Sequence, residues 1–367
     1  MRKILIVITT SFVQVGGLTT VMLNYYKAMD KSGLLIDFAS TNEPEEAMLS
    51  LLKSNNSSYY NLGPRKKHTI RYAHNLMKLI KRNEYDVVHI NGNSSTMIIE
   101  SIVARICKVQ DVICHLHAAS SSYPMINKIL SPVFRKTYSH AIAVSKQAGD
   151  WLFKQGYMVL NNAIDVEKYR FNLGSRSEIR GELGIEDKYV IGTVGKLNPL
   201  KNQTFLLELF AEYSKKDDDS VLVIVGGGPL DSELRHKAET LGISDRTIFL
   251  GLRPDVQSII QGFDVFVFPS IHEGLGLVLI EAQAAGLSCI ASDTIPKETH
   301  VSDYIDYLSL QSDFSIWIER INSIRNREFD RNAQSIDACK SINEHGYNVV
   351  SQTGKLEKIY RGNAEKR

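Results

Sequence analysis

The chain has 367 residues, a formal net charge of +2, a hydrophobic content of 43% and four cysteines. The apolar content excludes a disordered chain, the low cysteine count excludes a disulfide scaffold, and the near-zero charge argues against general nucleic-acid binding. Because a single hydrophobic core stops growing at roughly 250–300 residues, this length predicts two domains, and clefts between domains are common ligand sites.

The first residues combine two basic side chains with an apolar run, Ile4-Leu-Ile-Val-Ile8, in the manner of a signal peptide. The run is short and no small-residue cleavage pattern follows it, so a first buried strand is the better interpretation. No other stretch reaches the ~20 apolar residues of a membrane span. We therefore expect a cytoplasmic protein whose cysteines, which lack metal-ligand spacing, are reduced thiols.

Short apolar runs alternate with longer amphipathic segments along most of the chain. The runs predict strands at residues 3–8, 34–39, 58–62, 87–90, 111–115, 140–144, 158–160, 189–194, 221–225, 247–250, 265–268 and 288–291. Helical periodicity is present at residues 20–29, 70–81, 205–213, 231–241 and 275–285. Because the runs are apolar throughout, the strands should be buried on both faces, as in parallel sheets covered by crossover helices. The predicted fold class is α/β, doubly wound.

The strand and helix pattern restarts in the middle of the chain. Residues 170–188 are polar and carry no strand signal, and a new strand-loop-helix series begins at Tyr189. We therefore predict two Rossmann-like domains, residues 1–170 and 171–342, facing a central cleft. The last residues, 343–367, are compatible with a helix that packs back on the first domain.

Two glycine-rich loops follow predicted strands. Gly16 and Gly17 precede a helix, but the G-x-G-x-x-G fingerprint of a dinucleotide site is absent there. Gly227 and Gly228 belong to a second such loop, between a strand and a helix. Each loop either lets a ligand phosphate approach the backbone at a helix N-terminus or forms only a tight turn.

Two lysines, Lys196 and Lys201, lie between the strand at 189–194 and the next helix. Cations at the carboxyl end of a parallel strand, just ahead of a helix, are typical of an anion site. The alternative is that both lysines are solvated surface residues.

The segment from Phe268 to Gly286 predicts a strand end, a glycine-containing loop and an apolar helix. Glu273 lies in the loop, and its neighbours Gly274, Leu275 and Gly276 offer unpaired backbone N–H groups near the helix start. Glu281 lies within the helix, where a buried carboxylate costs several kcal/mol unless it is paired or reaches a polar ligand. Glu281 is therefore a site candidate, with a buried structural salt bridge as the alternative.

Two further polar motifs have competing interpretations. His115 and His117 alternate at a strand end, so both face one side, and their position favours the cleft over a structural or metal-binding role. The run Asp217-Asp-Asp219 contains the Asp-x-Asp of metal-dependent transferases, but its hydrophilic surroundings indicate a solvated turn. No metal site is predicted.

Taken together, these motifs resemble the family 4 retaining glycosyltransferases with the GT-B fold, over nearly the whole chain. The most specific match is the Glu-x7-Glu motif formed by Glu273 and Glu281. Supporting matches are Gly16-Gly17, the strand end at His117, Asn162-Ala-Ile-Asp165, Gly195 to Lys201, Gly226-Gly-Gly-Pro229 and Leu250 to Asp255. Within the family, the chain is similar to bacterial exopolysaccharide and capsule transferases of the EpsF type.

The resemblance implies a hexose transfer from a nucleotide sugar, UDP-linked, to a saccharide acceptor. Lys196 and Lys201 would bind the donor diphosphate, and Glu281 would bind the ribose hydroxyls. Glu273 with the backbone of Gly274, Leu275 and Gly276 would hold the donor sugar. Gly16 or Gly17 would approach the diphosphate from the other domain, and the loop of Gly227 and Gly228 would lie close to the donor. His117 would line the reacting centre, which makes His117, Lys201 and Glu273 the catalytic candidates. No cofactor is implied.

Two positions depart from the family pattern. Lys196 stands where Arg is usual, which keeps the charge but loses bidentate geometry, and Ala163 stands where Asn-Gly is usual.

The acceptor implied by the finer resemblance is a lipid-linked saccharide at a membrane. A basic stretch, Arg65-Lys-Lys67, and an apolar segment from Met125 to Phe134 are consistent with a peripheral membrane contact. Ordinary solvated helices are the alternative. We expect no nucleic-acid partner.

Two other functional classes share this architecture. A different GT-B enzyme, such as a sugar-nucleotide epimerase or a phosphorylase, would have the same two halves. A non-catalytic sugar-binding assembly subunit would keep the fold and lose cleft residues.

Overall fold

The computed structural model describes residues 1–13, 17–118 and 124–363 and divides into two compact units, each described by itself. Unit 1 comprises Met1–Ala163 and Val349–Arg367, and unit 2 comprises Ile164–Asn348. The division falls at Ala163, ahead of the boundary expected near residue 170. Ile164 donates its backbone N–H to the Tyr347 carbonyl at 2.9 Å and forms an isolated bridge with Asn348, which ties both to unit 2.

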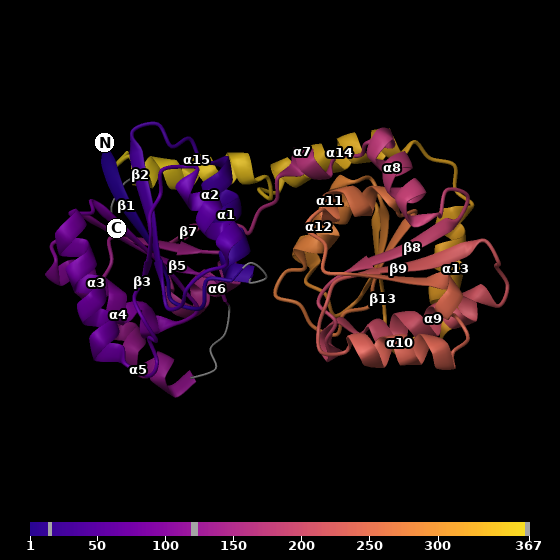
Figure 1. Ribbon diagram of the computed structural model, residues 1–367, viewed down its shortest axis with the longest axis horizontal. Helices are drawn as coiled ribbons and strands as arrows, with labels where there is room; N and C mark the ends of the chain where they lie inside the picture. The colour runs from indigo at the N-terminus through magenta and orange to yellow at the C-terminus, as the bar shows by residue number, and fades with distance from the viewer. Residues whose placement is uncertain (14–16, 119–123, 364–367) are drawn as a thin grey trace. The chain divides into compact units, whose positions relative to one another are not determined.

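Unit 1 is built on a seven-stranded parallel sheet of order β3-β2-β1-β4-β5-β6-β7 (Figure 1). Its strands are β1 (Arg2–Ile8), β2 (Leu34–Ser40), β3 (Tyr59–Asn61), β4 (Val87–Gly92), β5 (Asp111–Leu116), β6 (His140–Ala143) and β7 (Met158–Val159). Its helices are α1 (Gly17–Ala28), α2 (Glu46–Lys53), α3 (Thr69–Asn83), η1 (Ser95–Met97), α4 (Ile98–Ile106), α5 (Pro124–Phe134), α6 (Lys146–Leu152) and α15 (Val349–Tyr360).

Unit 2 is built on a six-stranded parallel sheet of order β10-β9-β8-β11-β12-β13. Its strands are β8 (Tyr189–Val194), β9 (Ser220–Val225), β10 (Thr247–Gly251), β11 (Val265–Phe268), β12 (Ser288–Ser292) and β13 (Ile305–Leu308). Its helices are α7 (Val166–Tyr169), α8 (Leu173–Leu183), η2 (Pro199–Lys201), α9 (Gln203–Ser214), α10 (Asp231–Thr240), η3 (Ser244–Arg246), α11 (Val256–Ile259), η4 (Ile260–Gly262), α12 (Leu277–Ala284), η5 (Lys297–Thr299), α13 (Phe314–Arg325) and α14 (Arg331–Glu344).

The doubly wound prediction holds in both units because apolar side chains leave each central strand on both faces. In β9, Val221, Val223 and Val225 belong to one core, whereas Leu222 and Ile224 belong to another. Helices therefore cover both faces of the sheet, as parallel strands require. All twelve predicted strands are present, and the structure adds β13, whose sequence Ile-Asp-Tyr-Leu is short and carries a charge.

The strand order reverses between β1 and β4 in the first sheet and between β8 and β11 in the second. Such a switch point leaves a crevice at the carboxyl ends of the two adjoining strands. In unit 2 the loops after β8 and β11 carry Lys201 and Glu273, and in unit 1 the end of β4 carries Asn91 next to the end of β5.

The last helix, α15, belongs to unit 1 although it follows the whole of unit 2 in the chain. Figure 1 shows it in yellow against the indigo elements of the amino-terminal part, and it packs on α1. Its Tyr360 is fully buried and its hydroxyl lies 2.6 Å from Nδ1 of His89 in β4.

Candidate active site

The loop after β8 fixes the backbone of Lys201. The side chain of Asn198 accepts a hydrogen bond from the Lys201 N–H at 3.1 Å and so caps η2. Asn202 then takes a left-handed conformation, with φ of 55°, and α9 begins at the next residue. This short turn determines where the Lys201 side chain starts, whereas Lys196 is exposed and has no ion pair among the described residues.

Lys201 and Glu273 meet because the loops that carry them follow neighbouring strands. Nζ of Lys201 forms an ion pair with Oε1 of Glu273, and both side chains are largely buried. The Ser270 hydroxyl lies 2.7 Å from the same carboxylate oxygen. The Lys201 Nζ also lies 5.0 Å from the centre of the Phe268 ring, within cation–π range. The two predicted site residues thus form one charged cluster at the switch point of the second sheet.

The loop after β11 leads into a short helix that begins later than expected. Gly276 is the residue before α12 and has φ of 87°, a conformation that favours glycine. Gly274 is exposed, and a Cβ there would meet no atom within 4 Å. Because the first N–H groups of a helix lack partners within the helix, the start of α12 offers backbone donors beside Glu273.

Glu281 lies in the second turn of α12 and accepts a hydrogen bond from the hydroxyl of Tyr169 in α7. Burial raises the pKa of the Glu281 carboxyl to about 7, and the Tyr169 hydrogen bond opposes part of that rise. No basic side chain forms an ion pair with Glu281 in the described part of the chain, so the salt-bridge alternative finds no support there. A carboxyl group in an apolar helix, with a pKa near 7 and only one hydrogen-bond donor, retains free acceptor capacity for a polar ligand.

The glycines of the β9–α10 loop are required by packing against the lysine loop. A Cβ on Gly226 would lie 2.0 Å from the Gly195 carbonyl oxygen, and one on Gly228 would lie 2.3 Å from that of Leu197. A Cβ on Gly227 would meet the Leu252 side chain at 2.9 Å. These contacts favour the turn interpretation of the glycine run, and they hold the loop of Lys196 and Lys201 in place.

The strand ends of unit 1 hold a column of three histidines, of which His89 and His115 are fully buried and His117 is half-buried. The rings of His115 and His117 lie 4.1 Å apart between centroids, which confirms that both face one side, and His89 stacks on His115 at 5.4 Å. Asn91 Oδ1 lies 2.9 Å from Nε2 of His117. Burial lowers the pKa of His89 and of His117 to about 3 and that of His115 well below its ordinary value, so all three rings are neutral near pH 7.

The glycine pair of the first loop is only partly within the described chain. Gly17 begins α1, whereas Gly16 lies outside the described residues.

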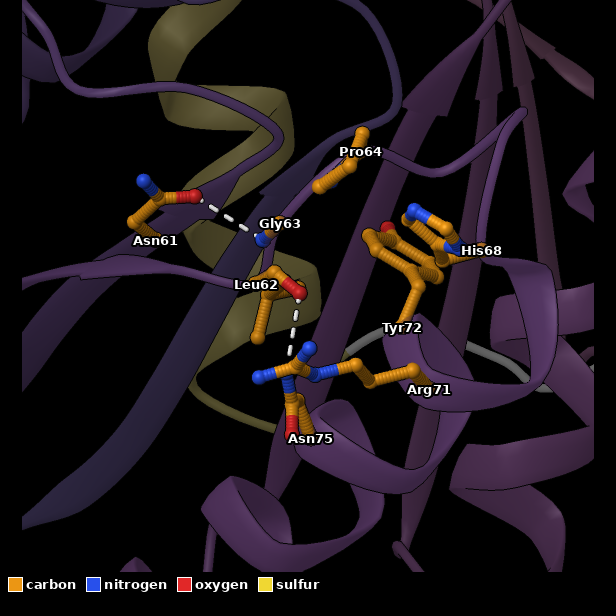
Figure 2. Close-up of a pocket in the computed structure, with 8 residues that line it drawn as sticks. All are labelled: Asn61, Leu62, Gly63, Pro64, His68, Arg71, Tyr72 and Asn75. Carbon is orange, nitrogen blue, oxygen red and sulfur yellow. Dashed lines mark hydrogen bonds between the residues drawn. The ribbon is translucent and has the colours of Figure 1, made fainter.

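Figure 2 shows a pocket of about 300 Å³ in unit 1, between the end of β3 and the first turns of α3. Two hydrogen bonds close parts of its wall: Gly63 N–H donates to Asn61 Oδ1 at 2.8 Å, and Asn75 Nδ2 donates to the Leu62 carbonyl at 3.0 Å. The basic side chains of His68 and Arg71 line it. None of the predicted site residues lines this pocket.

Two charged residues lie differently from the prediction for their segments. Arg65, expected in a membrane-facing basic stretch, is largely buried and pairs with the buried Glu100 at 2.6 Å, because its guanidinium links the β3–α3 connection to α4. Asp217, expected in a solvated turn, is largely buried and pairs with Arg325 of α13. Asp218 beside it is fully exposed, as expected.

Sequence reasoning missed four residues of these clusters: His89, Asn91, Ser270 and Tyr169. The pattern His89-Ile90-Asn91 at the end of β4 repeats the alternation of His115-Leu116-His117 at the end of β5, and that repetition was the available signal. Tyr169 carries no such signal, because its partner Glu281 is far away in the chain. Ser270 lies only three residues before its partner Glu273, within the same loop.

No helix within the described ranges is both long and apolar enough to cross a membrane. The same residues contain no group of three or more His, Cys, Asp or Glu side chains that could hold a metal ion.

Two family profiles match the chain, one in each half. Residues 15–168 match the profile described as Glycosyltransferase Family 4, and residues 175–335 match the one described as Glycosyl transferases group 1.

Two curated relatives extend over most of the chain. A Bacillus subtilis protein named as the glycosyltransferase EpsF is 30% identical, over 96% of this chain and 94% of the relative. The Escherichia coli UDP-Gal:alpha-D-GlcNAc-diphosphoundecaprenol alpha-1,3-galactosyltransferase is also 30% identical, over 78% of this chain and 77% of the relative.

Solved structures share the fold. HepE of Anabaena in complex with UDP superposes with a TM-score of 0.78 at 17% identity, covering 99% of this chain and 100% of that one. A glycosyltransferase of Rickettsia africae gives a TM-score of 0.81 at 16% identity, covering 98% of each chain. With both family profiles matched and a relative 30% identical over 96% of the chain, the chain belongs to the family 4, group 1 glycosyltransferases of GT-B fold and is an enzyme that acts on a nucleotide sugar.

Proposed function

We propose that this enzyme transfers a hexose from a UDP-linked donor to a lipid-linked saccharide acceptor in exopolysaccharide or capsule synthesis, with retention of anomeric configuration and without a metal ion. The observation that carries the proposal is the Lys201 and Glu273 pair at the switch point of the second sheet, beside the start of α12. In open α/β sheets, ligands bind at this crevice.

The donor diphosphate matches the positive groups of this site. When the glycosidic bond to the leaving group breaks, negative charge develops on the β-phosphate, and a preorganised cation lowers the barrier. Lys201 and the exposed Lys196 supply two cations, and the first N–H groups of α12 supply a partial positive charge. This set meets the charge requirement of the diphosphate, which supports a reaction that needs no metal or other cofactor.

The remaining site residues would hold the sugar and the nucleoside. Glu273 and the backbone of Gly274, Leu275 and Gly276 would bind donor sugar hydroxyls, and the Glu281 carboxylate would accept from the ribose hydroxyls. The backbone of Gly227 and Gly228 would border the donor. Gly16 or Gly17 would contact the diphosphate, and His117 would line the reacting centre.

Retention would proceed by attack of the acceptor on the face that the leaving diphosphate vacates. The acceptor oxygen forms the new glycosidic bond as the bond to the β-phosphate oxygen breaks, and a phosphate oxygen takes the acceptor proton. This route needs no protein nucleophile.

The donor and acceptor classes draw support from relatives. The E. coli relative is named for UDP-Gal and for a diphosphoundecaprenol-linked GlcNAc acceptor, and HepE has been solved with UDP-glucose.

The experiment that tests the transfer is a donor screen with the purified protein. UDP- and GDP-linked hexoses are offered with a diphospholipid-linked saccharide, and the products are separated and their anomeric configuration is determined. We expect release of UDP together with a lipid-linked saccharide that is longer by one hexose, whose anomeric configuration is the same as in the donor. An epimerised sugar nucleotide or a sugar phosphate would instead identify the rival enzyme classes, and binding without turnover would identify an assembly subunit.

A membrane-facing acceptor side is supported by the surface of α5 and α3. Met125, Ile129 and Val133 of α5 are 72%, 69% and 55% exposed, and Ile70 of α3 is 88% exposed. Exposed basic residues accompany them: Lys66, Lys67, Arg71, Lys78 and Lys128. Exposed apolar side chains with basic neighbours suit an anionic lipid surface.

Vesicle binding tests this contact. Replacing Lys67 and Arg71 with Gln should weaken binding to phosphatidylglycerol vesicles by about fivefold per residue, since each basic residue contributes about 1 kcal/mol. Lys216→Gln removes an exposed charge from unit 2 and serves as the matched control. Equal binding of parent and double variant would refute the contact. Binding to phosphatidylcholine vesicles should be weak for all three proteins.

A further inference from the structure

The hydroxyl of Ser270 lies among acceptor oxygens from two loops of unit 2. Ser270 is fully buried just after β11, and its Oγ lies 2.7 Å from Oε1 of Glu273 and 2.8 Å from the Leu200 carbonyl oxygen. The His272 carbonyl oxygen lies further away, at 3.4 Å. A carbonyl or carboxylate oxygen can only accept, so Ser270 must donate, and its hydroxyl has a single proton.

The carboxylate is the best acceptor for that proton. A hydrogen bond to an ionised oxygen is roughly twice as strong as one between neutral groups. The Leu200 carbonyl already accepts the Ile271 N–H at 2.8 Å, whereas Oε1 of Glu273 is the oxygen closest to the hydroxyl. Lys201 Nζ pairs with the same Oε1, so Ser270 and Lys201 together fix the orientation of the carboxylate.

The backbone of Ser270 is in turn held by the loop after β12. Its carbonyl oxygen accepts from the hydroxyl of Ser292, the last residue of β12, and from Oγ1 of Thr294 at 2.9 Å. Ser292 is fully buried, whereas Thr294 is exposed. Because β11 lies between β8 and β12 in the sheet, Ser270 links the loops that follow three neighbouring strands.

We propose that Ser270 is a positioning residue, whose hydroxyl orients the Glu273 carboxylate and so holds the Lys201 ammonium in place. The hydroxyls of Ser292 and Thr294 fix the Ser270 backbone, so the loop after β12 acts on the charged pair through Ser270. The inference rests on the proposed function only for the role of Lys201 toward the donor diphosphate.

The ammonium group of Lys201 reports on this arrangement in the full-length protein without any substrate. Lysine labelled with 15N is incorporated, and the Lys201 ammonium signal is assigned by its loss in Lys201→Arg. In Ser270→Ala the carboxylate loses a donor, so the Lys201 ammonium protons should exchange with water about fivefold to tenfold faster, the equivalent of one hydrogen bond. Because this readout needs no turnover, it stands apart from any failure of the proposed transfer reaction.

Steady-state kinetics give the second readout. In the proposed reaction Lys201 acts on charge that develops as the donor bond breaks, so its displacement should lower kcat more than it raises the KM for the donor. We expect kcat of Ser270→Ala to fall by about fivefold to tenfold, with a change in KM of about twofold or less.

Two substitutions at Thr294 test the part played by the loop after β12. Thr294→Val keeps the size of an exposed side chain and removes its hydroxyl. It should change both readouts in the same direction as Ser270→Ala but by only about twofold to threefold, because Ser292 still donates to the Ser270 carbonyl. Thr294→Ser restores the hydroxyl and should return both readouts to parent values.

Ser214→Ala is the matched control, because it removes another buried hydroxyl of unit 2, which donates to the Ala211 carbonyl at 3.1 Å. It should leave the Lys201 signal and kcat at parent values. Thermal melts measure the stability of each variant. If Ser270→Ala lowers only the melting temperature and keeps the parent exchange rate and kcat, its hydroxyl is merely structural and the proposal fails. If Thr294→Val and Thr294→Ser behave alike, the loop after β12 does not act through Ser270, and that part of the proposal fails.

Discussion

At the scale of single residues, the ion pair of Lys201 and Glu273 both positions the Lys201 ammonium and leaves it able to bind a phosphate. The carboxylate partner keeps the ammonium in place within a largely buried site, and the remaining Nζ protons stay available to a phosphate oxygen. A lysine that is positioned before the donor arrives needs no reorganisation when charge develops on the leaving group.

Lys201→Ala should lower turnover by roughly 10²–10³, because removing one preorganised group that stabilises developing charge has an effect of that size. Lys201→Arg retains the charge and should lose less. The comparison is steady-state turnover at saturating donor, with Lys215→Ala as the control, since Lys215 is exposed and pairs only with the exposed Glu212. Parent-like turnover in Lys201→Ala would contradict the assignment.

The raised pKa of Glu281 predicts a pH-dependent stability. Its folded pKa of about 7 lies above the ordinary value of 4.5, so between these pH values the folded chain holds a proton that the unfolded chain has released. The stability contributed by Glu281 is therefore complete below pH 4.5 and is lost as the pH rises through 7.

Glu281→Gln stays neutral at every pH and still accepts from Tyr169. The melting temperature of Glu281→Gln minus that of the parent should increase as the pH is raised from 5 to 8. The control Glu212→Gln, at an exposed site, should show no such trend. A pH-independent difference between Glu281→Gln and the parent would show that the carboxyl is already ionised at pH 5. The same variant should bind UDP more weakly, because a neutral amide accepts ribose hydroxyls less strongly than a carboxylate does.

At the scale of elements, the β9–α10 loop supports the lysine loop. Leu197 donates its N–H to the Gly227 carbonyl at 3.1 Å and accepts from the Leu230 N–H at 3.2 Å. Backbones can approach this closely only where side chains are absent.

Gly228→Ala should destabilise unit 2 by about 1–3 kcal/mol, because its Cβ would lie 2.3 Å from the Leu197 carbonyl oxygen and the loops must separate. It should also raise the KM for the donor, since Lys196 and Lys201 move with that loop. Gly181→Ala in α8 is the matched control, with 3.7 Å to the nearest atom that its Cβ would meet. Chemical denaturation and initial rates measure both effects, and a Gly228→Ala protein as stable as Gly181→Ala would contradict the packing role.

The sequence predicted the strands and the Glu-x7-Glu loop because both depend on local patterns. Runs such as Val221–Val225 are apolar throughout, and the change from strand to glycine loop to helix is visible around Glu273. The interactions that complete the site depend on residues far apart in the chain. Tyr169 reaches Glu281, Arg65 reaches Glu100 and Tyr360 reaches His89, and no local pattern indicates such pairs.

At the scale of the whole molecule, α15 makes the last part of the chain a structural part of unit 1. Tyr360→Phe removes the hydroxyl that lies 2.6 Å from Nδ1 of His89 and leaves that buried nitrogen without a partner. We expect a loss of about 1–3 kcal/mol from unit 1.

Calorimetric unfolding resolves this effect if the two units melt separately. The transition of unit 1 should shift down in Tyr360→Phe while that of unit 2 stays in place and serves as the internal reference. A shift confined to unit 2, or no shift at all, would contradict the assignment of α15.

The return of α15 also sets an order of events during synthesis. The residues of unit 1 up to Ala163 leave the ribosome first, yet the surface of α1 stays uncovered until Val349–Tyr360 has been made. Unit 2 intervenes, and at roughly 5–20 residues per second its translation takes on the order of 10–40 s. During that interval the second-made unit can already be folded, while the first-made unit exposes an apolar surface that chaperones would recognise.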